Sequence, residues 1–183
     1  MGEAYSWGVA DYKLDPSRST LTLRTRSGGF FGALAHDLEL TAPLLRGHAK
    51  LEGDRWDGEV VVEPTAIRVI GAIKKGQVDR SVLSANDVRE IERRLVDHFG
   101  GAREVVVRGT GTVDRPEVRV TVSREGTARV KAKATDEGDA RVVAVTGTVS
   151  MKALGLGEVK GPLGAFVIKD DVEVEGRATF VPA

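Results

Sequence analysis

Lys160-Gly161-Pro162-Leu163-Gly164-Ala165-Phe166 runs into the alternating stretch Val167-Ile168-Lys169-Asp170-Asp171-Val172-Glu173-Val174, close to the end of a chain of 183 residues. Side chains of a β-strand point alternately to its two faces, so alternation separates a buried face from a solvated one. We expect a strand over 164–181 that completes the closing hairpin of an antiparallel barrel. Its apolar parity holds Phe166, Ile168, Val172, Val174 and Phe180, and its polar parity holds Glu173, Glu175, Arg177 and Thr179.

Most of the remaining chain follows the same two-residue period. Gly28-Gly29 and Gly53-Asp54 are turn signals between alternating runs, and Pro64 predicts a break or an edge because proline cannot donate to a strand ladder. We therefore expect about eight to ten strands. Their expected ranges are 21–26, 36–42, 47–52, 56–70, 104–113, 117–124, 127–135, 140–152 and 164–181.

One segment, 84–99, changes to a helical period. Val88, Ile91, Leu95 and Phe99 recur at the spacing of one helix face. Ser84, with Asp87 three residues later, predicts an N-terminal capping box, and Gly100-Gly101 provides a stop. We expect the only long helix of the chain here, with its apolar stripe packed against an opening or a flank of the barrel.

Length and composition favour a single mainly-β domain. Twenty-seven basic residues balance 27 acidic ones, so no strong positive field attracts nucleic acid or an anionic membrane surface. The chain has no cysteine, which excludes disulfides and thiolate metal sites. At this length roughly two-thirds of the unfolded surface is buried on folding, enough for a core without covalent staples.

The N-terminal region shows neither a signal peptide nor an apolar run of the roughly 20 residues that a membrane helix requires. We expect a cytoplasmic protein without an integral membrane segment. The expected division is an N-terminal extension over 1–10 and a barrel domain over 11–183. Exposed strands pair between subunits in many proteins, so a homodimer is one expectation for the assembly.

The interior of the expected barrel has two interpretations. Around eight strands leave room for side chains or for one small ligand. The chain has only five Phe, two Trp and two Tyr, and valine and alanine dominate the later strands. This composition suits an open cavity, and it suits a filled small core equally well.

Four segments resemble the YceI-like family. They are Tyr12-Lys13-Leu14-Asp15-Pro16-Ser17-Arg18-Ser19-Thr20-Leu21, the glycine-rich bend that leads to Ala35-His36-Asp37-Leu38, the helix over 84–99, and the run from Lys160 to Val174. The resemblance covers about residues 11–181 and implies a lipocalin-like antiparallel β-barrel associated with polyisoprenoids or other long apolar ligands. Better-known members of the family are often exported, whereas this sequence shows no export signal.

Candidate ligand-binding residues lie at the glycine-rich bend and in the last hairpin. We expect a mouth or lining formed by Phe30, Phe31, Leu34, Leu38, Leu163 and Phe166, with plain core packing as the alternative. His36 shares the parity of Leu38 and Leu40, so it is expected to point inward. It serves either as an anchor for a polar head group or, as we favour, as a buried histidine paired with a backbone carbonyl or another polar group.

No motif of an enzyme is present, and we expect neither a cofactor nor a metal site. His48 and His98 lie in different predicted elements from His36, and the dipole at a helix C-terminus explains His98. Asp170 and Asp171 are adjacent on a strand, so they point apart and are expected to be solvated surface residues.

Three functions remain open at this level. The first is non-enzymatic binding of a long apolar molecule, such as an isoprenoid, quinone or acyl compound, for storage or transport. The second is a filled barrel that acts as a stress-related or protein-interaction domain. The third, which we do not favour, is an enzyme that uses His36 as a base.

Overall fold

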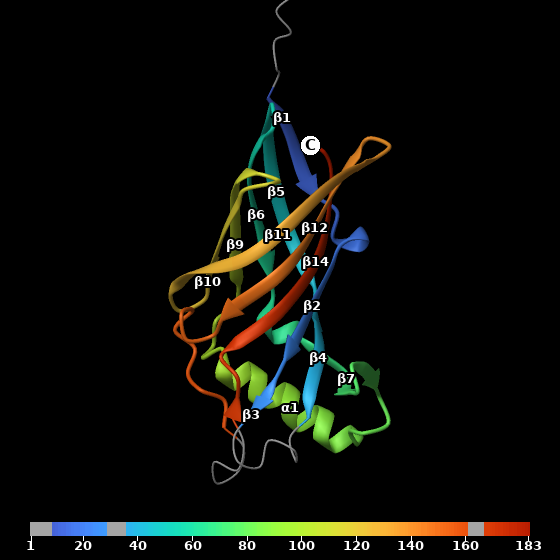
Figure 1. The fold of residues 1–183 in the computed structure, drawn as a ribbon, viewed down its shortest axis with the longest axis vertical. Helices are drawn as coiled ribbons and strands as arrows, with labels where there is room; N and C mark the ends of the chain where they lie inside the picture. Colours follow the sequence, from blue (N-terminus) through green and yellow to red (C-terminus); the bar gives the residue numbers. More distant parts are fainter. Residues whose placement is uncertain (1–8, 29–35, 161–166) are drawn as a thin grey trace, which may run out of the picture.

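Eight antiparallel strands form a closed barrel in the computed structural model, which describes residues 9–28, 36–160 and 167–183 (Figure 1). The ring closes where Tyr12 pairs with Pro182, so these strands have no free edge. In order of pairing the ring contains β1 (Ala10–Leu14), β5 (Leu44–Glu52), β6 (Arg55–Val62), β9 (Val105–Thr112), β10 (Pro116–Thr121), β11 (Glu125–Glu137), β12 (Ala140–Ser150) and β14 (Asp171–Pro182).

The sheet continues beyond the ring along the other half of β14. These additional strands pair in the order β2 (Thr20–Thr25), β4 (Asp37–Ala42), β7 (Arg68–Lys74) and β8 (Gln77–Asp79). The short strands β3 (Ser27–Gly28) and β13 (Val167–Ile168) pair with each other. Two 3-10 turns, η1 (Pro16–Arg18) and η3 (Pro64–Ala66), connect β1 to β2 and β6 to β7. The predicted break at Pro64 is therefore confirmed.

Helix α1 (Ala85–His98) lies across one end of the barrel, which we call the helix end (Figure 1). Ser84 and Asp87 form the predicted capping box, in which the Ser84 hydroxyl accepts from the Asp87 N–H and the Asp87 carboxylate accepts from the Ser84 N–H. Glu92 accepts a hydrogen bond from the Val69 N–H at 3.0 Å, which ties the helix to β7. The predicted helix and its position at a barrel opening are both confirmed.

The main hydrophobic cluster lies inside the barrel and extends from α1 to Phe180 of β14. Leu95 and Phe99 of the helix pack against it. A second cluster lies beside it under the loop after β12, and Phe99 contacts both. The main cluster contains Leu14, Leu40, Ala42, Leu44, Val62, Ile67, Val105 and Phe180, and the second contains Met151, Leu154, Leu156 and Val172.

The predicted strand over 164–181 is divided in the structure. β13 and β14 are separated at Lys169 and Asp170, where Lys169 donates its N–H to the Arg26 carbonyl and Asp170 turns toward the loop after β12. Asp170 accepts from the Ser150 hydroxyl and from the Lys152 N–H at 2.7 Å. The alternation of Val172, Val174 and Phe180 is confirmed within β14, while Ile168 joins the second cluster from a different strand.

Candidate functional site

The two ends of the barrel differ in what they offer a ligand. The helix end is covered by α1, as described above. The opposite end, which we call the open end, is marked by the turn at Gly53 and Asp54 between β5 and β6, and by the turn over 113–115 between β9 and β10 (Figure 1). Both ends carry polar groups among apolar side chains.

Most of the residues predicted to form the mouth lie outside the described part of the chain. These are Phe30, Phe31, Leu34, Leu163 and Phe166. Leu38 is half-buried on β4, pairs with Thr25 and packs against the main cluster, so it faces inward as expected. The role of all six as ligand contacts stays a prediction.

His36 directly precedes β4 and is half-buried. It makes no hydrogen bond or ion pair to any residue of the described ranges. Asp37, its neighbour, instead binds β3: it accepts from the Ser27 N–H at 2.7 Å and pairs with Arg26 at 3.3 Å. The two residues therefore do not act as a unit, and Asp37 has a structural role at the end of the strand.

Two polar atoms at the helix end are buried without a hydrogen-bond partner in the described residues. They are Oγ1 of Thr25, a residue only 8% exposed, and Nε2 of His98. Thr25 pairs with Leu38, and His98 precedes Phe99, which contacts both hydrophobic clusters. An unsatisfied buried polar atom costs free energy, so each is a potential contact for a polar group of a ligand.

The structure corrects the explanation of His98 from the helix dipole. The dipole attracts an imidazolium, but burial lowers the pKa of His98 because the charged form loses hydration. The imidazole is therefore a neutral side chain on the inward face of α1. The sequence placed His98 in the last turn correctly, but it did not indicate that the imidazole is partly buried there.

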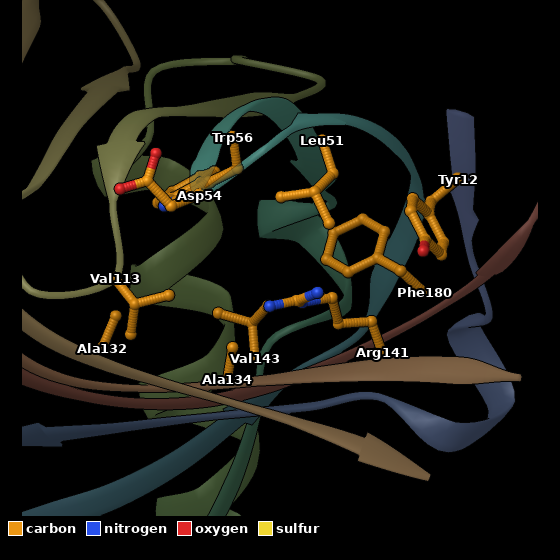
Figure 2. A pocket seen from close by; sticks show the side chains of 10 residues that line it. All are labelled: Tyr12, Leu51, Asp54, Trp56, Val113, Ala132, Ala134, Arg141, Val143 and Phe180. Atoms are coloured by element: carbon orange, nitrogen blue, oxygen red, sulfur yellow. The ribbon is translucent and has the colours of Figure 1, made fainter. Parts of the chain in front are cut away.

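The open end contains a hollow that leads into the barrel (Figure 2). The cavity volume is about 40 Å³, so the hollow is small, and it is open to solvent at its mouth. Its exposed lining is almost entirely apolar, which suits a hydrocarbon group more than a sugar or a nucleotide. The lining residues come from six strands and two turns and are Tyr12, Leu51, Asp54, Trp56, Val113, Ala132, Ala134, Arg141, Val143 and Phe180.

Small residues create the space in this half of the barrel. Ala132 and Ala134 of β11 face inward opposite Val145 and Val143. Trp56 fits inside because Gly109 on the adjacent strand has no side chain: a Cβ there would overlap the indole ring. The hollow thus depends on small residues at inward positions: the two alanines of β11, and Gly109, against which the Trp56 ring lies.

Arg141 is the cation of the hollow. Its strand register sets it opposite Phe180, a residue of the main cluster, and so on the inward face of β12. Figure 2 shows its side chain extending among the apolar lining residues rather than away from them. The guanidinium has one ion pair in the described residues, at 3.8 Å to Asp136, and its side chain is 33% exposed.

None of the residues that line the open end was among the ligand contacts predicted from the sequence. The available signal was the parity of Arg141, which it shares with Val143 and Val145 in a strand predicted over 140–152. That signal was ambiguous because Val142 has the opposite parity and is also buried, on the outer face. There η1 covers it: Thr179, the partner of Val142, donates its hydroxyl hydrogen to the Arg18 carbonyl at 2.8 Å.

Other chemistries find no support in the described ranges. No group of three or more His, Asp or Glu side chains is arranged to hold a metal ion, and no helix is long and apolar enough to cross a bilayer. Asp171 pairs with Arg129 at 3.0 Å on the surface, as expected for a solvated carboxylate. Asp170 is also exposed, as expected, and in addition it holds the loop after β12 in place.

Comparisons with known proteins support the fold. No family model matches the chain, and no curated protein sequence matches it. The structure is similar to the crystal structure of Burkholderia cenocepacia BcnA, with a TM-score of 0.56 and 8% sequence identity over 91% of this chain and 98% of that one. At this identity the match shows a shared architecture. The chain is thus a closed antiparallel β-barrel with the fold of BcnA.

Proposed function

We propose that this protein is a YceI-like binding protein that holds the apolar part of a long molecule inside its barrel, for storage or transport and without catalysis. The observation that carries the proposal is the apolar hollow at the open end, which continues into a closed barrel. The fold shared with BcnA and the four sequence segments that resemble the YceI-like family agree with it.

The energetics of such binding require few polar contacts. Each buried methylene contributes roughly 0.8 kcal/mol, so a segment of several carbons in the hollow supplies a substantial affinity. The packed main cluster limits how far a ligand enters without rearrangement, because Phe180 belongs both to that cluster and to the lining of the hollow. The structure therefore favours a ligand whose terminal apolar segment enters from the open end.

The alternative is a filled barrel that acts through its outer surface. The packing of the helix half favours it, since Leu95 and Phe99 close that end against a continuous cluster. In this alternative the hollow is a surface depression, and the relevant partner is another protein.

A binding experiment with a hollow-filling variant separates these alternatives. Gently purified protein is analysed by native mass spectrometry and solvent extraction, then titrated with geranylgeraniol as a neutral isoprenoid probe. Ala132→Leu places a larger side chain into the hollow, while Ala144→Leu makes the same change at an exposed position of β12 and serves as the matched control.

We expect a one-to-one complex for the wild-type protein and Ala144→Leu, and at least tenfold weaker binding for Ala132→Leu. Equal binding by all three proteins would place the ligand away from the open end. No extracted lipid and no geranylgeraniol binding by the wild-type protein would support the filled barrel instead.

A further inference from the structure

We propose that the open end selects ligands with a single negative charge, such as the carboxylate of a long-chain fatty acid, and that Arg141 is the residue that recognises it. This inference rests on the proposed binding function and specifies the chemical class of the ligand. The juxtaposition that carries it is a guanidinium among the apolar side chains at the mouth of a closed barrel.

The position of Arg141 is unusual for an arginine of this barrel. Arg24, Arg26, Arg108 and Arg129 all form ion pairs of 3.3 Å or less. Arg141 instead faces inward beside Phe180 and Val143. Its one ion pair within the described part of the chain spans 3.8 Å to an aspartate whose side chain is 72% exposed. Such a solvated pair contributes little to stability, so a ligand carboxylate can replace Asp136 at the guanidinium.

Arginine suits a carboxylate for geometric reasons. Its planar fork of N–H donors matches the two oxygens of a carboxylate, and its charge is retained at any physiological pH. In a partly desolvated mouth this charge-assisted interaction is stronger than in bulk water. The head group of an acid would thus meet the guanidinium while its hydrocarbon chain contacts Trp56, Ala134 and Phe180.

Nearby carboxylates indicate how much negative charge the site accepts. Asp54 lines the hollow together with Arg141, and Asp136 lies 3.8 Å from the guanidinium. A ligand with two or more negative charges, such as a phosphate monoester, would be repelled by both aspartates and attracted by a single arginine. Among anionic head groups, the charges therefore fit a monoanion better than a dianion.

The test compares two ligands that differ only in the head group. Dodecanoate and 1-dodecanol are titrated into the full chain at pH 7.5, with Trp7→Phe as the background so that Trp56 is the only tryptophan and its fluorescence reports occupancy of the hollow. Arg141→Met removes the charge and retains the length. Arg177→Met removes an arginine from β14 whose partner is Glu137, outside the hollow, and is the matched control.

We expect Arg141→Met to weaken dodecanoate binding by about tenfold to a hundredfold, the range for loss of one charge-assisted hydrogen-bonded contact. Binding of 1-dodecanol should change less than threefold, and Arg177→Met should affect neither ligand. Arg141→Lys keeps the charge without the planar fork and should show an intermediate loss of dodecanoate affinity.

The outcomes distinguish this inference from the proposed function. If both ligands bind the wild-type protein and Arg141→Met weakens them equally or not at all, the head-group inference is overturned while the binding function stands. If neither ligand perturbs Trp56 or binds by calorimetry, both proposals fall. Circular dichroism of each variant confirms that the fold is retained, and Arg141→Gln replaces Arg141→Met if the latter does not fold.

Discussion

The helix end and the open end of this barrel are built from different residues and are filled to different extents. At the helix end, large aliphatic side chains and Phe99 fill the interior, and α1 covers it. At the open end, alanine and glycine line the strands, and Trp56 and Arg141 occupy the space they leave. The interior at the helix end is therefore closely packed, whereas the interior at the open end contains unfilled space.

This division separates the packed core of the barrel from the hollow at its open end. Protein interiors are close-packed and tolerate changes in volume poorly. A cavity in the middle of the main cluster would therefore lower the free energy of unfolding. Because the hollow lies at one end, it does not interrupt the main cluster, which includes Leu14 and Phe180. This difference predicts that substitutions at the helix end mainly lower the free energy of unfolding. Substitutions at the open end should mainly change ligand affinity.

The largest effect is expected at the helix end. Leu40→Ala removes a side chain that is 3% exposed in the main cluster, and should lower the free energy of unfolding by about 2–5 kcal/mol. Ala132→Leu, in the hollow, should lower it by less than Leu40→Ala does, about 1–3 kcal/mol at most, because part of the added volume enters the hollow. Urea unfolding measures both. Similar losses for the two variants would contradict the division.

A second substitution probes the boundary between the two halves. Gly109→Ala places a methyl group into the volume of the Trp56 ring, and should lower the unfolding free energy by about 1–3 kcal/mol and shift the Trp56 fluorescence. Gly157→Ala is the control, because nothing lies within 4 Å of the added carbon. An unchanged emission spectrum would show that the ring does not rest on Gly109.

The attachment of the helix is tested at its N-cap. Ser84→Ala removes the hydroxyl that accepts from the Asp87 N–H, and should cost about 1 kcal/mol of stability. Ser84→Thr keeps a capping hydroxyl and should lose less. Ligand binding at the open end should be the same in both variants, and a change of affinity in Ser84→Ala would indicate coupling between the ends.

A smaller, pH-dependent effect is expected from His98. Burial lowers its pKa in the folded state, so below about pH 6.5 the unfolded chain binds the proton first and stability falls as the pH decreases. His98→Leu should remove this loss between pH 6.5 and 5. Thermal unfolding across that range is the measurement, and identical pH profiles for the two proteins would contradict a buried neutral imidazole.

Loss of stability at still lower pH has a separate origin. Hydrogen bonds from Arg93 and Arg94 lower the pKa of Glu90 to about 2, and those from Ser150 and Lys152 lower the pKa of Asp170. Such carboxylates stabilise the fold above their unfolded pKa, near 4, and this contribution is lost as the pH falls further. The two ranges do not overlap, so the His98 effect is measurable on its own.

Much of the architecture was predictable because it depends on local rules. Alternation along Leu21-Thr22-Leu23-Arg24 and along β14 follows from the two-residue period of a strand. The capping box at Ser84 and the helical spacing up to Phe99 are likewise properties of neighbouring residues. For these elements the sequence contains the whole physical cause, and the structure confirms them.

The tertiary structure alone decided which face of each strand is buried and where the interior stays open. Val142 and Val143 are adjacent and both apolar, and only the position of η1 outside and the register with Phe180 inside show that Arg141 points into the barrel. The burial of His98 and the division between β13 and β14 also depend on segments distant in sequence. Contacts between segments far apart in the chain determine both features, and no local pattern encodes such contacts.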